Sequence, residues 1–235
     1  MCWKNEDFMK PQHRIFITVI TWLTYISLLV ALYFAFIYAP TEKSMGDVQR
    51  IFYFHVPSAW VSFIAFFVVC LASLAFLRTG KAQWDILAAS SAEVGVLFIT
   101  LVLITGPLWA KPVWQTYWTW DARLTTSFVL WLIYVSYLIL RRYIEDQERG
   151  ARFAAVFGII GFIDVPIVYL SIRWWRTLHP APVIGGSEGS GLAPQMLTAL
   201  MVCLFAFTLL YVLLLLMRYG AISTARTVEF LKTRM

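Results

Sequence analysis

Six stretches of the sequence are each long and apolar enough to cross a lipid bilayer, and this feature constrains the fold more than any other. The hydrocarbon core of a bilayer is about 30 Å thick, and a helix needs about 20 residues to cross it. Backbone polar groups in lipid must be satisfied within the spanning structure, so these runs are expected to be helices. The sequence therefore predicts an all-α integral membrane protein, a single domain over residues 1–235 with six transmembrane helices at Ile15–Ala39, Pro57–Leu77, Ile86–Pro107, Leu124–Leu140, Phe153–Ile172 and Pro194–Met217.

The composition excludes the other broad classes of protein. Hydrophobic residues make up 60% of the chain and charged residues 14%, whereas an average soluble domain is about 45–50% apolar and about 25% charged. The formal net charge of +6 does not indicate nucleic-acid binding, because basic residues of membrane proteins collect in the cytoplasmic loops. The three cysteines form no Cys-x-x-Cys pair, so neither a disulfide framework nor a thiol redox motif is expected.

The distribution of lysine and arginine predicts the orientation in the membrane. The two ends of the chain and the loops at 78–85 and 141–152 carry 13 of these residues, and the other three loops carry 6. Cytoplasmic segments are enriched in lysine and arginine, so both termini are expected to be cytoplasmic. Residues 40–56, 108–123 and 173–193 then form the outer loops.

Tryptophans gather on the outer side of the predicted bundle. Seven of the 11 lie there, against three on the inner side. Indole rings favour the headgroup region of a bilayer, so an interfacial belt is one interpretation. A belt is expected at both interfaces, however, and the excess on one side favours an aromatic surface for a large, planar, apolar ligand. The loop at 108–123 contributes Trp109, Trp114, Trp118 and Trp120, with Tyr117 among them.

Two of the three histidines also lie on the outer side. His55 precedes Pro57, which suits the first turn of the second helix, and His179 lies in the third outer loop. Imidazole is a common axial ligand of haem iron, and two histidines from separate segments could hold one porphyrin from opposite faces. A zinc site would need a third or fourth protein ligand, and the acidic residues of the outer loops do not have metal-ligand spacing.

Three charged residues near these aromatic and histidine residues have both a binding and a structural interpretation. Arg50 and Arg123 lie on the outer side, and arginine is the preferred partner of carboxylates such as the haem propionates. Contact with lipid headgroups is the alternative for both. Asp121 precedes the fourth helix, where a carboxylate accepts backbone N–H bonds and interacts favourably with the helix dipole.

Two acidic residues, Glu93 and Asp164, lie inside expected spans. Ionisable groups inside a membrane are costly and are candidates for function. Neither residue has an evident basic partner within a span. They are expected either to be neutral and hydrogen-bonded between helices or to form part of a polar path.

Three sequence motifs resemble a known family. The segment WQTYWTWDARLT at 114–125 is similar to the tryptophan-rich WWD signature of haem-handling membrane proteins, and its ending resembles that of the cytochrome c maturation family CcmC. RIFYFHVPSAW at 50–60 and WWRTLH at 174–179 also match this family, as do the length and the six spans. The sequence departs from the signature at Ala110 and Gln115, where glycines are usual, and at Tyr117, where a tryptophan is usual.

The resemblance implies a role, a set of partners and a location. Proteins of this family present haem b at the outer face and promote its covalent attachment to the haem chaperone CcmE, beside CcmA, CcmB and CcmD of an ABC-transporter complex. The implied axial ligands are His55 and His179. The resemblance also implies the bacterial inner membrane, with the mitochondrial inner membrane as the lesser option. The implied platform and propionate partners are Trp109, Trp114, Trp118, Trp120, Asp121, Arg50 and Arg123, with Tyr117 keeping an aromatic face at its position.

The sequence also permits functions other than that of a haem-presenting assembly factor. The sequence has no phosphate-binding GxxxxGK[ST] loop and no evident Ser-His-Asp arrangement, so an enzyme in the ordinary sense is not expected. A transporter or permease subunit is the main alternative, because Glu93 and Asp164 lie within spans. A membrane cytochrome b is a weaker one, because no histidine lies inside an expected span.

Overall fold

The protein is a bundle of helices in a computed structural model that describes residues 11–144, 146–175, 179 and 191–232. Six helical segments are long and apolar enough to cross a membrane, and the fifth of them consists of two consecutive helices. The predicted all-α, six-span fold class is therefore confirmed. The helices are α2 (Pro11–Tyr33), the π-helical η1 (Phe34–Tyr38) that continues it, the 3-10 helix η2 (Asp47–Ile51), α3 (Phe52–Thr79), α4 (Ala82–Trp114), α5 (Ala122–Tyr143), α6 (Gln147–Phe162), α7 (Asp164–Trp174) and α8 (Pro194–Lys232).

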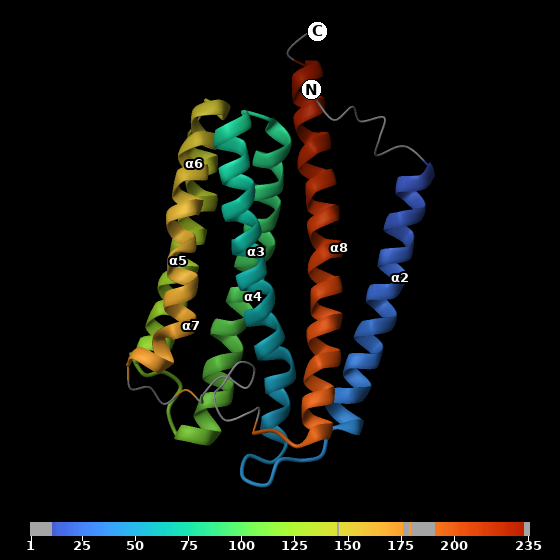
Figure 1. Ribbon diagram of the computed structural model, residues 1–235, viewed down its shortest axis with the longest axis vertical. Helices are drawn as coiled ribbons and strands as arrows, with labels where there is room; N and C mark the ends of the chain where they lie inside the picture. The colour runs from blue at the N-terminus through green and yellow to red at the C-terminus, as the bar shows by residue number, and fades with distance from the viewer. Residues whose placement is uncertain (1–10, 145, 176–178, 180–190, 233–235) are drawn as a thin grey trace.

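The connections alternate between the two ends of the bundle (Figure 1). Residues 39–46, residues 115–121, the end of α7 and the start of α8 lie at one end, which we call the loop end. The short α3–α4 and α5–α6 connections lie at the opposite end, together with the start of α2 and the end of α8. The three predicted outer loops thus share one end, although most of the third lies outside the described residues.

The helices do not all end where the apolar runs end. Helix α4 continues past Pro107 and Pro112 to Trp114, so the first half of the predicted loop at 108–123 is helical. Helix α3 begins at Phe52, which places His55 and Pro57 inside it. Each of these prolines removes one backbone N–H from the helix that contains it. The expectation that no histidine lies within a spanning helix is therefore wrong for His55.

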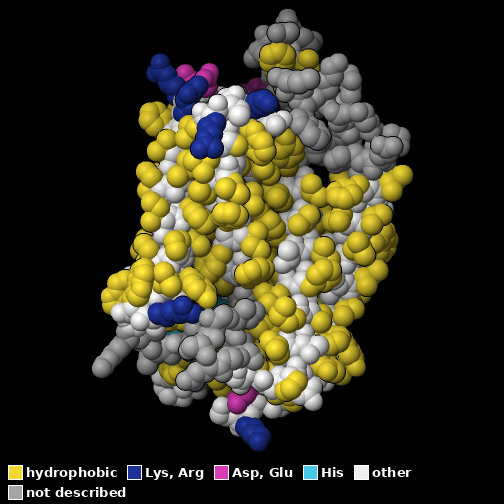
Figure 2. Space-filling model, in the orientation of Figure 1, with side chains coloured by type: hydrophobic (Ala, Val, Ile, Leu, Met, Phe, Trp, Pro, Cys, Tyr) yellow, Lys and Arg dark blue, Asp and Glu magenta, His cyan; other side chains and the backbone are white. Residues whose placement is uncertain are grey.

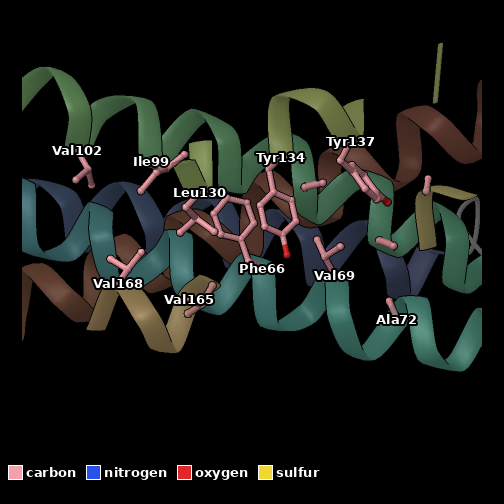
Figure 3. Packing of buried hydrophobic residues seen from close by; sticks show 13 residues of the cluster. Phe66, Val69, Ala72, Ile99, Val102, Leu130, Tyr134, Tyr137, Val165 and Val168 are labelled. Atoms are coloured by element: carbon pink, nitrogen blue, oxygen red, sulfur yellow. The ribbon is translucent and has the colours of Figure 1, made fainter. Parts of the chain in front are cut away.

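The largest core cluster joins α3, α4, α5, α6 and α7 (Figure 3). At its centre the rings of Phe66 and Tyr134 stack with centroids 3.7 Å apart and planes 11° apart. Gly95 of α4 faces the Phe66 ring closely, because a Cβ at this position would lie 2.6 Å from Phe66 Cε1. Small residues let membrane helices approach each other closely. The contact at Gly95 therefore holds α4 close to α3.

A buried ion-pair cluster holds the other end of the bundle together. Asp85 of α4 is 2% exposed and accepts hydrogen bonds from Arg141 of α5 at 2.6 and 2.8 Å. Arg226 of α8 donates to the same carboxylate at 2.5 Å. The charged side chains visible in Figure 2 lie toward the two ends, and hydrophobic side chains cover the band between them. This distribution is what a bilayer requires of the surface.

Candidate ligand-binding site at the loop end

A cavity of about 810 Å³, counted with its open mouth, lies at the loop end between α3, α4 and α5. The wall is mostly apolar and aromatic with a few polar groups, as in sites for large organic ligands. Eight of the ten predicted site residues line this cavity, namely His55, Trp109, Trp114, Tyr117, Trp118, Asp121, Arg123 and His179. The other two, Arg50 and Trp120, do not.

His55 reaches the cavity from the beginning of α3. It is only 8% exposed, and its Nδ1 lies 2.8 Å from the hydroxyl oxygen of Thr105 on α4. The Trp109 ring stands edge-on to the imidazole, with ring centroids 5.9 Å apart and planes 63° apart. The ring of His55 is therefore held between two neighbours on α4, and its remaining ring nitrogen is the one that is available to a ligand.

His179 lines the same cavity from the segment that follows α7. It is partly buried, whereas residues 176–178 and 180–190 on either side lie outside the described part of the chain. The two histidines come from positions far apart in the sequence, and only the fold brings them to one cavity. No group of three or more His, Cys, Asp and Glu side chains that could hold a metal ion exists among the described residues.

The aromatic residues of the cavity come from two consecutive segments. Trp109 and Trp114 belong to the last turns of α4, and Tyr117 and Trp118 follow in the chain segment that leads to α5. Trp109 Nε1 is buried and has no hydrogen-bond partner within the described residues. Buried indole N–H groups are usually hydrogen-bonded, so this donor is a candidate for contact with a bound polar group.

Trp120 lies beside the cavity and not in its wall. Its side chain is 74% exposed and packs edge-to-face against Trp118, with ring centroids 5.6 Å apart. With Trp118, Phe128 and Trp131 it lines a second, apolar hollow between α4 and α5. The structure thus separates Trp118, which borders both spaces, from Trp120, which borders only the outer one.

Asp121 shapes the corner between the aromatic segment and α5. It is the N-cap of α5, and its carboxylate accepts hydrogen bonds from the backbone N–H groups of Arg123 at 3.0 Å and Leu124 at 3.2 Å. The Thr119 hydroxyl donates to the other carboxylate oxygen at 2.9 Å. The predicted role of this carboxylate at the helix start is confirmed, and an N-cap of this kind contributes about 1 kcal/mol.

Among the described residues that line the cavity, Arg123 carries the one guanidinium. Its Nη1 donates to the backbone carbonyl of Val168 on α7 at 2.5 Å, which ties α5 to α7. A guanidinium has five N–H donors in a planar fork, and within the described residues these carbonyl contacts of Nη1 are its side-chain hydrogen bonds. The remaining donors can bind a carboxylate in the cavity.

Arg50 is placed elsewhere, between the end of η1 and η2. Its guanidinium donates to the carbonyl of Ala35 at 2.6 Å and pairs with Asp47 at 3.1 Å. In the adjacent loop the N–H of Met45 and the Ser44 hydroxyl bind the Glu42 carboxylate and lower the pKa of Glu42. The structure therefore gives Arg50 a role in shaping this loop and does not bring it to the cavity of His55.

The expectation that Glu93 lacks an evident basic partner within a span is wrong, because the last spanning helix extends beyond Met217 and carries one. Arg218 of α8 donates to both carboxylate oxygens of Glu93, with Nη2 at 2.9 Å from Oε1. Arg218 directly follows Met217, where the apolar run ends, and α8 continues as a helix for several more turns. Asp164 begins α7, and its Oδ2 is buried without a partner within the described residues. Both acids lie away from the cavity lining.

Some residues of the site carry no signal in the sequence. Thr105, which contacts His55, and Ala59, Phe63 and Val102, which line the cavity, are ordinary members of apolar helices. Only the packing of α3 against α4 reveals them.

The chain matches the sequence model of one family, heme exporter protein C, over residues 3–234. Heme exporter protein C of Bradyrhizobium diazoefficiens is 39% identical over 213 residues, which cover 88% of this chain and 81% of that protein. The protein of the same name from Haemophilus influenzae is 34% identical over 223 residues, covering 92% and 91%. A ccmC-like mitochondrial protein of Marchantia polymorpha, named for cytochrome c biosynthesis, is 38% identical over 150 residues, covering 64% and 63%. The chain belongs to the heme exporter protein C family.

Proposed function

We propose that this protein binds haem b at the outer face of the membrane and presents it for covalent attachment to the haem chaperone CcmE. Membership of the heme exporter protein C family supports a role in haem handling for c-type cytochrome biogenesis. The proposed role is that of an assembly factor and not of an enzyme in the ordinary sense. The proposed partners are CcmE and the subunits CcmA, CcmB and CcmD of an ABC-transporter complex.

The observation that carries the proposal is the meeting of His55 and His179 at one aromatic cavity. Two imidazoles from separate segments suit the two axial positions of a haem iron. The surrounding indole and phenyl rings offer the apolar area that a planar macrocycle buries. Arg123 supplies a cation for a propionate in the same space. The proposed platform consists of Trp109, Trp114, Tyr117, Trp118, Trp120 and Asp121, with Trp120 at its exposed edge.

The proposed orientation places the loop end outside and both termini in the cytoplasm. Within the described residues, the start of α2, the α3–α4 and α5–α6 connections and the end of α8 lie opposite the cavity and are richer in lysine and arginine than the loop end, in line with the positive-inside rule. A bacterial inner membrane is the proposed location, and the mitochondrial inner membrane is the lesser option, since a mitochondrial relative also exists.

The absorption spectrum of the detergent-purified protein with added haem tests the proposal. We expect a low-spin, bis-imidazole spectrum for the wild type, and loss of haem or a high-spin spectrum for His55→Ala and for His179→Ala. His13→Ala is the matched control, because His13 lies at the start of α2, at the other end of the bundle, and its spectrum should equal that of the wild type. Absence of haem uptake by the wild type, or unchanged spectra of both cavity variants, contradicts the proposal.

The Glu93–Arg218 pair is the feature of the structure that favours the alternative function of a transporter subunit. The double variant Glu93→Gln/Arg218→Gln removes both charges and avoids leaving one of them unpaired. On our proposal this variant still binds haem and still supports haem attachment to CcmE. Loss of attachment with intact haem binding would favour the transporter function.

A further inference from the structure

The Thr105 hydroxyl occupies a defined place in a chain of hydrogen bonds behind His55. Its oxygen lies 2.7 Å from the backbone carbonyl of Leu101, one turn earlier on α4. A carbonyl oxygen only accepts hydrogen bonds, so the Thr105 hydroxyl can place its proton on this contact with Leu101. The hydroxyl oxygen is then left to accept a hydrogen bond, and the atom next to it, at 2.8 Å, is Nδ1 of His55.

This arrangement favours one tautomer of His55. A neutral imidazole carries one N–H donor and one unprotonated acceptor nitrogen. When the Thr105 hydroxyl donates to Leu101, its oxygen accepts from His55, so the imidazole proton is on Nδ1 and Nε2 keeps its lone pair. The hydrogen bond of one ring nitrogen sets which nitrogen can ligate a metal.

We propose that Thr105 is a positioning residue that fixes the tautomer and orientation of His55, so that an unprotonated Nε2 is presented to haem iron in the cavity. This inference rests on the proposed haem-binding function. Thr105 itself does not line the cavity. It acts through the imidazole, as the outer partners of metal-ligating histidines do.

The surroundings of the ring leave it little freedom. Trp109 stands at one side of the imidazole. Gly106, the neighbour of Thr105, comes close enough that a Cβ there would lie 3.5 Å from His55 Cε1. The ring is 8% exposed. With the proton on Nδ1, the Nδ1–H donates to the Thr105 oxygen and the Thr105 hydroxyl donates to Leu101, so both contacts are hydrogen bonds. In the opposite tautomer the single hydroxyl proton serves either Nδ1 or Leu101, and one of the two hydrogen bonds is lost.

The tautomer is measured on haem-free protein labelled with ¹⁵N-histidine. The chain has three histidines, and His13→Ala and His179→Ala variants assign the His55 ring signals by elimination. We expect a protonated Nδ1 and an unprotonated Nε2 in the wild type, and a mixture of tautomers in Thr105→Val, which keeps the shape of the side chain but not its hydroxyl. A protonated Nε2 in the wild type overturns the inference.

Haem affinity gives the second measurement. Loss of an outer partner costs metal sites about 10–100-fold in affinity, so we expect that decrease in Thr105→Val. Thr105→Ser keeps the hydroxyl and should rescue affinity to within about threefold of the wild type. Thr100→Val is the matched control, since Thr100 also bonds a backbone carbonyl of α4 but contacts Trp131 instead of a histidine. Its haem affinity should not change.

These measurements separate the two proposals. If Thr105→Val binds haem as tightly as the wild type, Thr105 is not a positioning residue, while the haem-binding function stands. If the wild type shows the expected tautomer but takes up no haem, the proposed function fails, and the role of Thr105 toward iron fails with it.

Discussion

Lys111 and Gln115 exchange two hydrogen bonds at the end of α4. The N–H of Gln115 donates to the Lys111 carbonyl at 3.0 Å, and the Lys111 ammonium donates back to the Gln115 carbonyl at 3.0 Å. Gln115 has φ of 61° and is the only residue other than glycine with positive φ in the described part of the chain. This left-handed cap turns the chain out of α4 and into the segment that contributes Tyr117 and Trp118 to the cavity.

Gln115→Gly is expected to stabilise the protein. A left-handed conformation costs an L-residue about 1–2 kcal/mol, and glycine adopts it without this cost. Glycine is also the usual residue at such a helix C-cap. The thermal unfolding midpoint in one detergent should therefore rise. Gln195→Gly is the control, because Gln195 lies in the first turn of α8 and glycine there should give no gain. A fall in the midpoint for Gln115→Gly would contradict the prediction.

The sequence predicts some features of the fold and not others, and the difference has a physical reason. The six spans follow from apolar length, and the N-cap role of Asp121 follows from its residue type and place. Hydropathy does not show that α4 continues past Pro107 and Pro112 to Trp114. Proline is a helix-breaking residue in a sequence pattern, but here the helix continues through both prolines. Nor can it show that α8 extends past Arg218, because polar and charged residues interrupt the apolar run there.

The contacts between distant segments were equally out of reach. The positions of His55 and Thr105 in one hydrogen-bonded pair depend on the register of α3 against α4. The placement of Arg50 among the carbonyls of η1, away from the cavity, depends on how the first loop folds back. Residue type alone gave no reason to prefer Arg123 over Arg50 as a partner of the haem propionates.

Gly95→Ala is expected to destabilise the bundle. A Cβ at this position would meet Phe66 Cε1 at 2.6 Å and the Ala65 side chain at 3.0 Å, so the stacked Phe66–Tyr134 pair must shift. Overpacking of this kind costs about 1–3 kcal/mol. Gly106→Ala serves as the control, because its added Cβ makes an ordinary contact at 3.5 Å. Thermal unfolding should distinguish the two, and equal midpoints would argue against close packing at Gly95.

Asp85→Asn should be far more damaging than loss of a surface ion pair. Asp85 is 2% exposed and balances both Arg141 and Arg226, so the substitution leaves two partly buried cations without a counter-ion. Breaking a buried pair in this way costs about 3–5 kcal/mol. Glu148→Gln breaks the exposed pair with Arg152 and should cost less than about 1 kcal/mol. Similar unfolding midpoints for the two variants would show that the Asp85 cluster does not hold the helices together.

Trp118→Ala should weaken haem binding more than Trp120→Ala. Trp118 lines the cavity, whereas Trp120 is 74% exposed beside it. Loss of an aromatic contact worth about 1.4 kcal/mol corresponds to about a tenfold loss of affinity. Haem titration of the two purified variants measures the difference. We expect less than about a threefold change for Trp120→Ala, and the reverse order would place the ligand in the outer hollow.

The two outer arginines give the sharpest test of the electrostatics of the site. Arg123→Lys should lower haem affinity, because lysine cannot reproduce the planar fork that binds a carboxylate while Nη1 holds the Val168 carbonyl. Arg50→Lys should leave haem affinity unchanged and lower the unfolding midpoint, because Arg50 binds backbone carbonyls and Asp47 and does not line the cavity. Affinity for a haem whose propionates are esterified provides the control. The effect of Arg123→Lys should disappear with the esterified ligand, since it carries no carboxylate. A loss of haem affinity in Arg50→Lys that also depends on free propionates would move the propionate site from Arg123 to the η1–η2 loop.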